Sequence, residues 1–126
     1  YDRFKDLWCD HFTLDRGSYA IMKGLSKTTP TYLLSNTHAL HIEYIRARYA
    51  FASQVKGAIL SHELGLRKPQ PEIYHAALKL SGTAPDETLF IDDLEENCAG
   101  ARAVGLHAIR YRGAPELKRR LAALGL

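Results

Sequence analysis

The segment Thr88-Leu89-Phe90-Ile91-Asp92-Asp93 decides the fold expected for this chain. Its apolar run, Thr88 to Ile91, is short and continuous, which is typical of a strand buried on both faces of a parallel sheet. A helix is expected after the acidic pair, from about Glu95 to Val104, because acidic residues occupy its first turn and Gly105 ends it. A strand, two carboxylates and a helix in this order predict a ligand site at the edge of a sheet.

Other apolar runs alternate with stretches of helical period along the chain. Pro71 and Gly82 bound one such stretch, since proline favours a first helical turn and glycine ends a helix. The pattern predicts an α/β fold, a three-layer Rossmann-like parallel sheet with flanking helices, in a single domain over residues 1–126. The further strands are expected at Thr31 to Ser35, Val55 to Leu60 and Leu106 to Ile109, and the further helices at Tyr1 to His11, Gly17 to Lys27, His38 to Tyr49, Pro71 to Leu80 and Ala114 to Leu124.

The composition excludes several classes of protein. A chain of 126 residues, 46% hydrophobic and 25% charged, is sufficient for one globular domain with a core. The net charge of +3 is mild and the basic residues are scattered, apart from three near the end. No apolar stretch reaches the roughly 18 residues of a membrane span, the start is not a secretory signal, and Cys9 and Cys98 lack metal-binding spacing. We therefore expect a cytoplasmic protein that binds neither nucleic acid nor membrane.

Two more polar clusters join the acidic pair at the same edge of the expected sheet. The hydroxyl of Ser35 and the neighbouring Asn36 follow one strand, and Lys68 lies in a loop further along. Ser35 can donate to a phosphoryl oxygen, and Lys68 offsets the charge of a phosphate beside carboxylates. We expect Asp93 to ligate Mg²⁺, a hard cation that takes oxygen ligands, and Asp92 to ligate it through water or to orient the surrounding groups. The sequence predicts a site for a phosphate and a divalent cation.

Each of these residues also has a plain structural interpretation. A serine at the end of a strand serves as a turn donor, a lysine before a proline is usually solvated, and an Asp pair before a helix can act as its N-cap. The histidines have no Cys or His partner at metal spacing and are expected on polar faces or loops; they are His38, His41 and His62. The functional interpretation depends on the three clusters occurring together and in order.

In that order the clusters resemble the motifs of the haloacid dehalogenase superfamily of hydrolases. Ser35-Asn36-Thr37 resembles its second motif, Lys68-Pro69 its third, and Asp92-Asp93 with Asn97 and Gly100 to Gly105 its fourth. The resemblance runs from about Trp8 to Tyr111. It implies a Mg²⁺-dependent phosphatase that acts on small organic phosphates through an aspartyl-phosphate intermediate. The catalytic residues it implies are Ser35, Lys68 and Asp93, the substrate-binding residues Ser35, Asn36 and Lys68, and the metal ligands Asp92 and Asp93.

The first motif of that superfamily, an Asp-x-Asp sequence on a central strand, has no counterpart in this sequence. We therefore expect a truncated chain that lacks its nucleophile and its central strand and is inactive alone, with residues 1–15 as the remnant of a cap or linker helix. An empty centre would leave the strands at Thr31 to Ser35 and Thr88 to Ile91 with unpaired edges. The gap would then close, recruit a strand from a partner or by self-association, or leave the domain marginally stable.

Other functions stay open at this point. A non-catalytic phosphate-binding or scaffold protein of the same ancestry would keep Ser35 and Lys68 without turnover. A true dehalogenase is disfavoured by the resemblance, because those enzymes depart from the paired Asp92-Asp93 and need no Mg²⁺. A receiver domain is excluded because its Asp pair comes first along the chain, whereas here the pair comes last.

Overall fold

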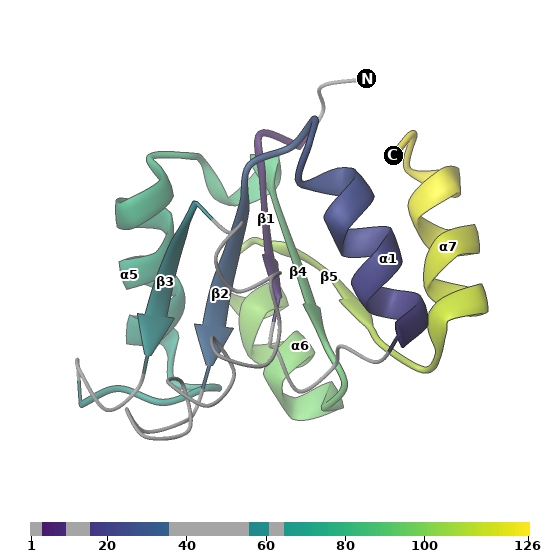
Figure 1. The fold of residues 1–126 in the computed structure, drawn as a ribbon. Helices are drawn as coiled ribbons and strands as arrows, with labels where there is room; N and C mark the ends of the chain where they lie inside the picture. The colour runs from purple at the N-terminus through teal and green to yellow at the C-terminus, as the bar shows by residue number, and fades with distance from the viewer. Residues whose placement is uncertain (1–3, 10–15, 36–55, 61–64) are drawn as a thin grey trace.

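The computed structural model describes residues 4–9, 16–35, 56–60 and 65–126. These residues form a five-stranded parallel sheet in the order β3-β2-β1-β4-β5, and helices cover both of its faces (Figure 1). The expected three-layer α/β architecture is therefore confirmed. The elements are β1 (Asp6–Cys9), α1 (Arg16–Leu25), β2 (Thr31–Ser35), β3 (Gly57–Leu60), α5 (Pro71–Ser81), the 3-10 turn η2 (Pro85–Glu87), β4 (Thr88–Asp92), α6 (Glu95–Ala103), β5 (His107–Arg110) and α7 (Ala114–Ala123).

The centre of the sheet differs from the expectation. The helix expected over Tyr1 to His11 is wrong, and so is the expected empty central position, because Asp6–Cys9 forms β1 between β2 and β4. The side chains of Leu7, Trp8 and Cys9 are all 0% exposed. Three consecutive buried residues suit a central strand, which is covered on both faces, whereas a surface helix exposes part of its circumference.

Pairing of β1 on both sides removes the problem that an empty centre would create. Trp8 is in register with Tyr32 of β2 and with Phe90 of β4. Buried backbone groups left without hydrogen bonds would be costly, and β1 satisfies those of both neighbours. The chain's own residues thus fill the position for which a strand-donating partner or self-association is expected, so the reason for expecting either no longer holds.

A buried carboxylate anchors the start of β1, at the edge of the sheet opposite the carboxyl ends of the strands. Asp6 is 1% exposed. Its Oδ2 accepts a hydrogen bond from the indole Nε1 of Trp8 at 2.8 Å, and its Oδ1 accepts one from Thr83 Oγ1 at 2.6 Å. The Thr88 hydroxyl lies 3.1 Å from the same Oδ1. These contacts tie β1 to the loop after α5 and to the start of β4.

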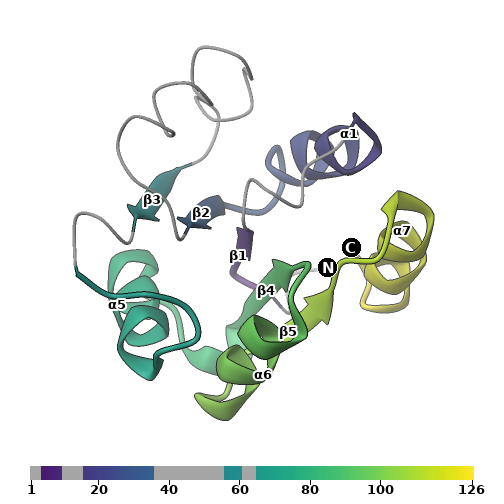
Figure 2. The same cartoon turned by 90° about the horizontal axis from the view of Figure 1, so that it is seen from below.

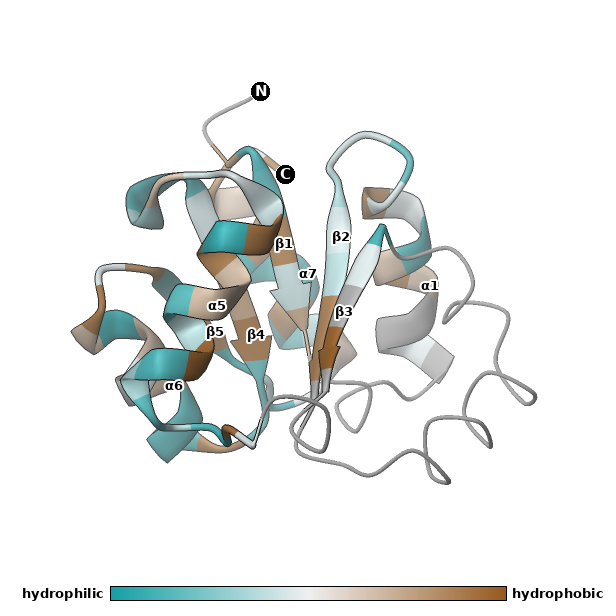
Figure 3. Ribbon diagram, turned by 90° about the vertical axis from the view of Figure 1, so that its left-hand side faces the viewer, coloured by the Kyte–Doolittle hydropathy of each residue, from teal (hydrophilic) through white to brown (hydrophobic). Residues whose placement is uncertain are grey.

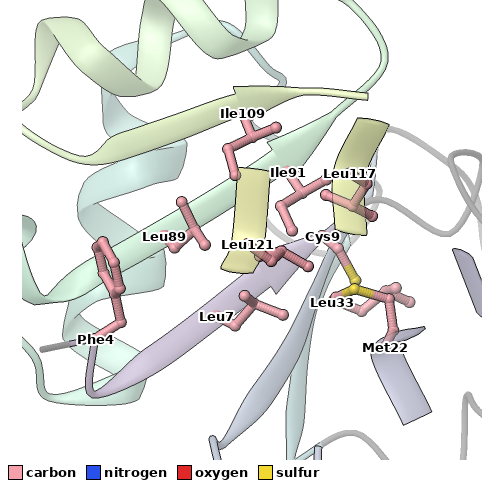
Figure 4. Close-up of a cluster of buried hydrophobic side chains, with 10 residues drawn as sticks. All are labelled: Phe4, Leu7, Cys9, Met22, Leu33, Leu89, Ile91, Ile109, Leu117 and Leu121. Atoms are coloured by element: carbon pink, nitrogen blue, oxygen red, sulfur yellow. The ribbon is translucent and has the colours of Figure 1, made fainter. Parts of the chain in front are cut away.

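Alternation along the strands divides the core into two clusters. Leu7 and Cys9 of β1 face α1 and α7, whereas Trp8 faces α5 and α6; Figure 2 shows these two helix pairs on opposite sides of the sheet. Figure 4 shows the first cluster, where strand residues meet Met22 of α1 and Leu117 and Leu121 of α7. In the second cluster the Trp8 and Tyr32 rings stack at 4.7 Å, and Figure 3 shows hydrophobic residues gathered on the strands behind α5 and α6.

Most other expected elements are confirmed with small shifts. Helix α5 starts at Pro71, and Gly82 follows it in the left-handed conformation, with φ 72°. Strand β5 lies one residue later than expected, and β3 begins at Gly57 in the described part of the chain. The helix expected over His38 to Tyr49 lies outside the described residues. None of the described helices is long and apolar enough to cross a membrane.

Candidate active site

The candidate site lies at the carboxyl ends of the parallel strands, the lower edge of the sheet in Figure 1. Ser35 is the last residue of β2, and Asp92 is the last residue of β4. Strand β1 runs between them and ends at Cys9, which is in register with Leu33 and Ile91. Neighbouring strands are spaced by about 4.8 Å, so the backbones of β2 and β4 are roughly 10 Å apart. The end of β1 therefore lies in the middle of a small polar edge.

Asp92 makes several polar contacts with the described residues of this edge. Its side chain is fully buried, and its Oδ2 lies 2.5 Å from the Nζ of Lys68. The same oxygen accepts a hydrogen bond from Asn97 Nδ2 at 3.3 Å, and Oδ1 accepts one from the backbone N–H of Leu94 at 3.0 Å. A buried carboxylate needs such donors because desolvation of an unpaired charge is costly. Asp92 is thus held in one orientation by groups from α6 and from the Lys68 loop.

Lys68 is unusual because it is buried while the residues next to it in the loop are exposed. The loop precedes α5; Arg67, Pro69 and Gln70 around Lys68 are exposed, whereas the Lys68 side chain is 0% exposed. Its ammonium group lies 5.6 Å from the centre of the Phe90 ring. The peptide bond between Lys68 and Pro69 is cis. Because its side chain is buried, the plain interpretation of Lys68 as a solvated loop lysine is wrong, and Lys68 brings its charge to the strand edge.

Asp93 differs from Asp92 in its surroundings although the two are adjacent. It is exposed, whereas Asp92 is 0% exposed. Its backbone carbonyl accepts a hydrogen bond from Arg110 Nε of β5 at 3.3 Å. A cation approaching from solvent would meet the Asp93 carboxylate first, while Asp92 already serves three protein donors.

The pair of carboxylates fits Mg²⁺, which keeps several waters and is commonly held by one or two carboxylates. The described part of the chain contains no group of three or more His, Cys, Asp or Glu side chains that could hold a metal. Asp93 can supply a direct oxygen ligand, and the buried Asp92 can orient the neighbouring groups. These metal-binding roles of Asp93 and Asp92 stay a prediction.

Two buried groups behind Asp92 are kept neutral. Cys98 Sγ lies 3.6 Å from the Asp92 carbonyl oxygen, and burial, with the charge of Asp92 as a second cause, raises the pKa of the Cys98 thiol to about 11. Burial and the Asp92 charge also hold the pKa of Tyr74 above its usual range. Both groups are therefore protonated near neutral pH, and Cys98 is a small core residue rather than a reactive thiol.

The structure brings together some of the expected site residues. Lys68 and Asp92 meet in a buried ion pair, Asp93 directly follows Asp92 in the chain, and the backbone of Ser35 ends its strand at the same edge. Asn36 lies outside the described residues, as do His38, His41 and His62. Tyr74 is a residue that sequence reasoning missed: its hydroxyl donates to the carbonyl of Asn97 at 2.7 Å, a tertiary contact with no local sequence signal.

A family description, haloacid dehalogenase-like hydrolase, matches residues 4–105 of the chain. The chain therefore belongs to the haloacid dehalogenase-like hydrolases, as the resemblance of its motifs implies. Among curated proteins it is 29% identical, over 128 residues, to a D-ribitol-5-phosphate phosphatase of Bacteroides thetaiotaomicron. That alignment covers 95% of this chain and 62% of the relative, so the chain spans less than two thirds of the length of that enzyme.

Two solved structures are similar in fold. One is a family enzyme from Bacteroides thetaiotaomicron in complex with magnesium and inorganic phosphate, with a TM-score of 0.69 and 30% identity over 77% of this chain and 52% of that one. The other is an uncharacterized protein from Corynebacterium glutamicum, with a TM-score of 0.82 and 22% identity, covering 96% of this chain and 94% of that one. The second similarity concerns the fold alone.

Proposed function

We propose that this chain provides the phosphate-binding and Mg²⁺-binding core of a phosphatase for small organic phosphates. The observation that carries the proposal is the buried Lys68–Asp92 ion pair beside the exposed Asp93 at the carboxyl edge of the sheet. A phosphatase relative and a family structure that holds magnesium and phosphate support this assignment. A cytoplasmic location is part of the proposal, and it is consistent with the buried Cys9 and Cys98, which no disulfide joins in the described part of the chain.

Each residue would have a defined role. Lys68 would offset the negative charge of the phosphate, and Asp92 would hold its ammonium group in place. Asp93 would ligate Mg²⁺ directly, and Asp92 would ligate it through water or orient the groups around it. The bound ion would neutralise charge that develops on the phosphoryl oxygens. Ser35 and Asn36 would donate hydrogen bonds to the same oxygens from the end of β2.

Turnover through an aspartyl-phosphate would require a nucleophilic carboxylate. The sequence contains no Asp-x-Asp; the residue that follows Cys9, the end of β1, is Asp10, and Phe12 follows two residues later. Because the family uses a second aspartate as acid and base, we propose that the chain alone binds phosphate without hydrolysing it at an appreciable rate. The second candidate function is that of a non-catalytic phosphate-binding or scaffold protein of the same ancestry. The absence of Asp-x-Asp from the sequence is the observation that favours it.

Binding and turnover should be measured separately. Calorimetry with inorganic phosphate and Mg²⁺ tests the site, and release of p-nitrophenol from p-nitrophenyl phosphate tests hydrolysis. We expect Asp93→Asn to weaken Mg²⁺ binding by on the order of tenfold, with Asp86→Asn, an exposed aspartate of η2, as the matched control. Absence of any phosphate or Mg²⁺ binding by the folded chain would refute the proposed site. Hydrolysis that Asp10→Asn abolishes would instead refute the inactivity of the chain.

A further inference from the structure

The position of the Lys68 loop depends on its contact with α6. Gly100 of α6 faces Pro69, the residue after Lys68: a Cβ atom built on Gly100 would lie 2.8 Å from the Pro69 Cβ and 3.0 Å from the Pro69 carbonyl oxygen. Ordinary contacts of this kind begin at 3.4 Å, so any side chain at residue 100 would push the loop and the helix apart by about 0.6 Å. The absence of a side chain on Gly100 therefore sets how closely the loop approaches α6.

A second contact fixes the other side of the loop. Tyr74 lies in the first turns of α5, a few residues after Lys68, and it is 0% exposed. Its hydroxyl donates to the Asn97 carbonyl, and its ring meets the Phe90 ring edge to face at 5.6 Å. The ring edge also bounds Gly100, since a Cβ there would lie 3.1 Å from the Tyr74 Cε2 atom. Gly100 and Tyr74 are thus two parts of one packing contact between α5, α6 and the loop.

Asn97 connects this packing contact to the Lys68–Asp92 ion pair. Asn97, whose carbonyl receives the Tyr74 hydroxyl, also donates its side-chain amide to the Asp92 Oδ2 atom that Lys68 contacts. Asn97 lies on α6 and Lys68 in the loop, so a shift of α6 relative to the loop would move these two partners of Asp92 by different amounts. An oriented charge at a phosphate site loses effect when it is displaced by a fraction of an ångström to an ångström.

We propose that Gly100 and Tyr74 are positioning residues that seat Lys68 at Asp92 and thereby set phosphate affinity. This inference rests on the proposed function for its consequence, but its structural step concerns the Lys68–Asp92 pair alone. The prediction is that a methyl group at residue 100 loosens the ion pair without unfolding the domain, and that loss of the Tyr74 hydroxyl has a smaller effect in the same direction.

The test compares Gly100→Ala with Gly24→Ala. Gly24 is also in a helix, α1, and a Cβ there meets nothing within 4 Å, which makes it a matched control for the same chemical change. The readouts are the ¹H–¹⁵N signal of the Lys68 ammonium group and the calorimetric affinity for inorganic phosphate with Mg²⁺. We expect Gly100→Ala to shift or broaden the Lys68 signal and to weaken phosphate binding by on the order of tenfold. Gly24→Ala should change neither.

Tyr74→Phe keeps the ring and removes only the hydroxyl. If Gly100→Ala does not fold, Tyr74→Phe tests whether this packing contact positions Lys68. A Lys68 signal and a phosphate affinity unchanged in a folded Gly100→Ala variant, or in Tyr74→Phe when that variant must serve alone, would overturn the inference. If the unmodified protein binds no phosphate, the proposed function fails, while the Lys68 signal still decides whether Gly100 and Tyr74 position the ion pair.

Discussion

The central position of β1 can be tested by a double-mutant cycle on Asp6 and Thr83, which are 77 residues apart and joined by a 2.6 Å hydrogen bond. Asp6→Ala removes the acceptor of the Trp8 indole N–H and of the Thr83 hydroxyl. Each of these two donors costs about 1–3 kcal/mol when it is left unsatisfied, or about 2–6 kcal/mol together. Relief of the buried charge offsets part of that cost, so we expect a net loss of about 3 kcal/mol in the free energy of unfolding. At about 2.1 cal/mol/K per residue, this corresponds to a fall in Tm of roughly 11 °C.

The assay is urea unfolding of the unmodified protein, Asp6→Ala, Thr83→Ala and the double variant, followed by circular dichroism. Thr83 also contacts the hydroxyls of Ser81 and Thr88, so its single variant reports more than one contact, and the cycle isolates the Asp6–Thr83 term. We expect a coupling energy of about 1–2 kcal/mol. Asp86→Ala, at an exposed residue, is the control and should stay within about 0.5 kcal/mol. Additivity within about 0.3 kcal/mol would refute the placement of Asp6 beside Thr83, and with it the central position of β1.

Three further predictions concern stability. Lys68→Met should destabilise the fold by about 3–5 kcal/mol, because it leaves the buried Asp92 carboxylate without its cation, whereas Lys79→Met on the exposed side of α5 should change the urea midpoint little; equal effects would contradict the buried pair. Gly24→Ala should raise the free energy of unfolding by about 0.5–1 kcal/mol in the same assay, since a helix favours alanine and the added methyl meets open space. A lower free energy of unfolding in this variant would contradict the open space beside Gly24. The raised pKa of Cys98, about 11 against 9.0, means that the unfolded thiol ionises first, so stability is complete below pH 9 and falls between about pH 9 and 11. Cys98→Ala should make the urea midpoint fall less steeply with pH across this range. An unchanged slope of midpoint against pH would contradict the raised pKa of Cys98.

The sequence was informative where local pattern and final environment agree. The strand Thr88 to Ile91 with its acidic pair, the helix after it and the helix from Pro71 to Gly82 are fixed by apolar runs, capping residues and turn glycines, which act over a few residues. The placement of Asp92 at the carboxyl edge of the sheet was also predictable, because residues that end parallel strands meet at one edge.

Strand β1 could not be predicted in the same way. Its four residues are flanked by charges and contain a single apolar triplet, Leu7-Trp8-Cys9, too short to show a period of two. What makes it a strand is the pair of neighbours that it contacts, β2 and β4, and the second of these lies some eighty residues further along the chain. Similarly, nothing near Lys68 in the sequence signals its burial, which depends on Asp92 and on the missing side chain of Gly100.

The burial of Trp8, which stacks on Tyr32, makes tryptophan fluorescence a probe of the central strand. Trp8 is the sole tryptophan of the chain, and it lies fully buried between β2 and β4 with its indole N–H bound to Asp6. Its fluorescence therefore reports the burial of β1 between its neighbouring strands and beneath α5 and α6. Comparison of emission with backbone circular dichroism would show whether the sheet closes around this strand in the same transition as the helices form, or before or after it.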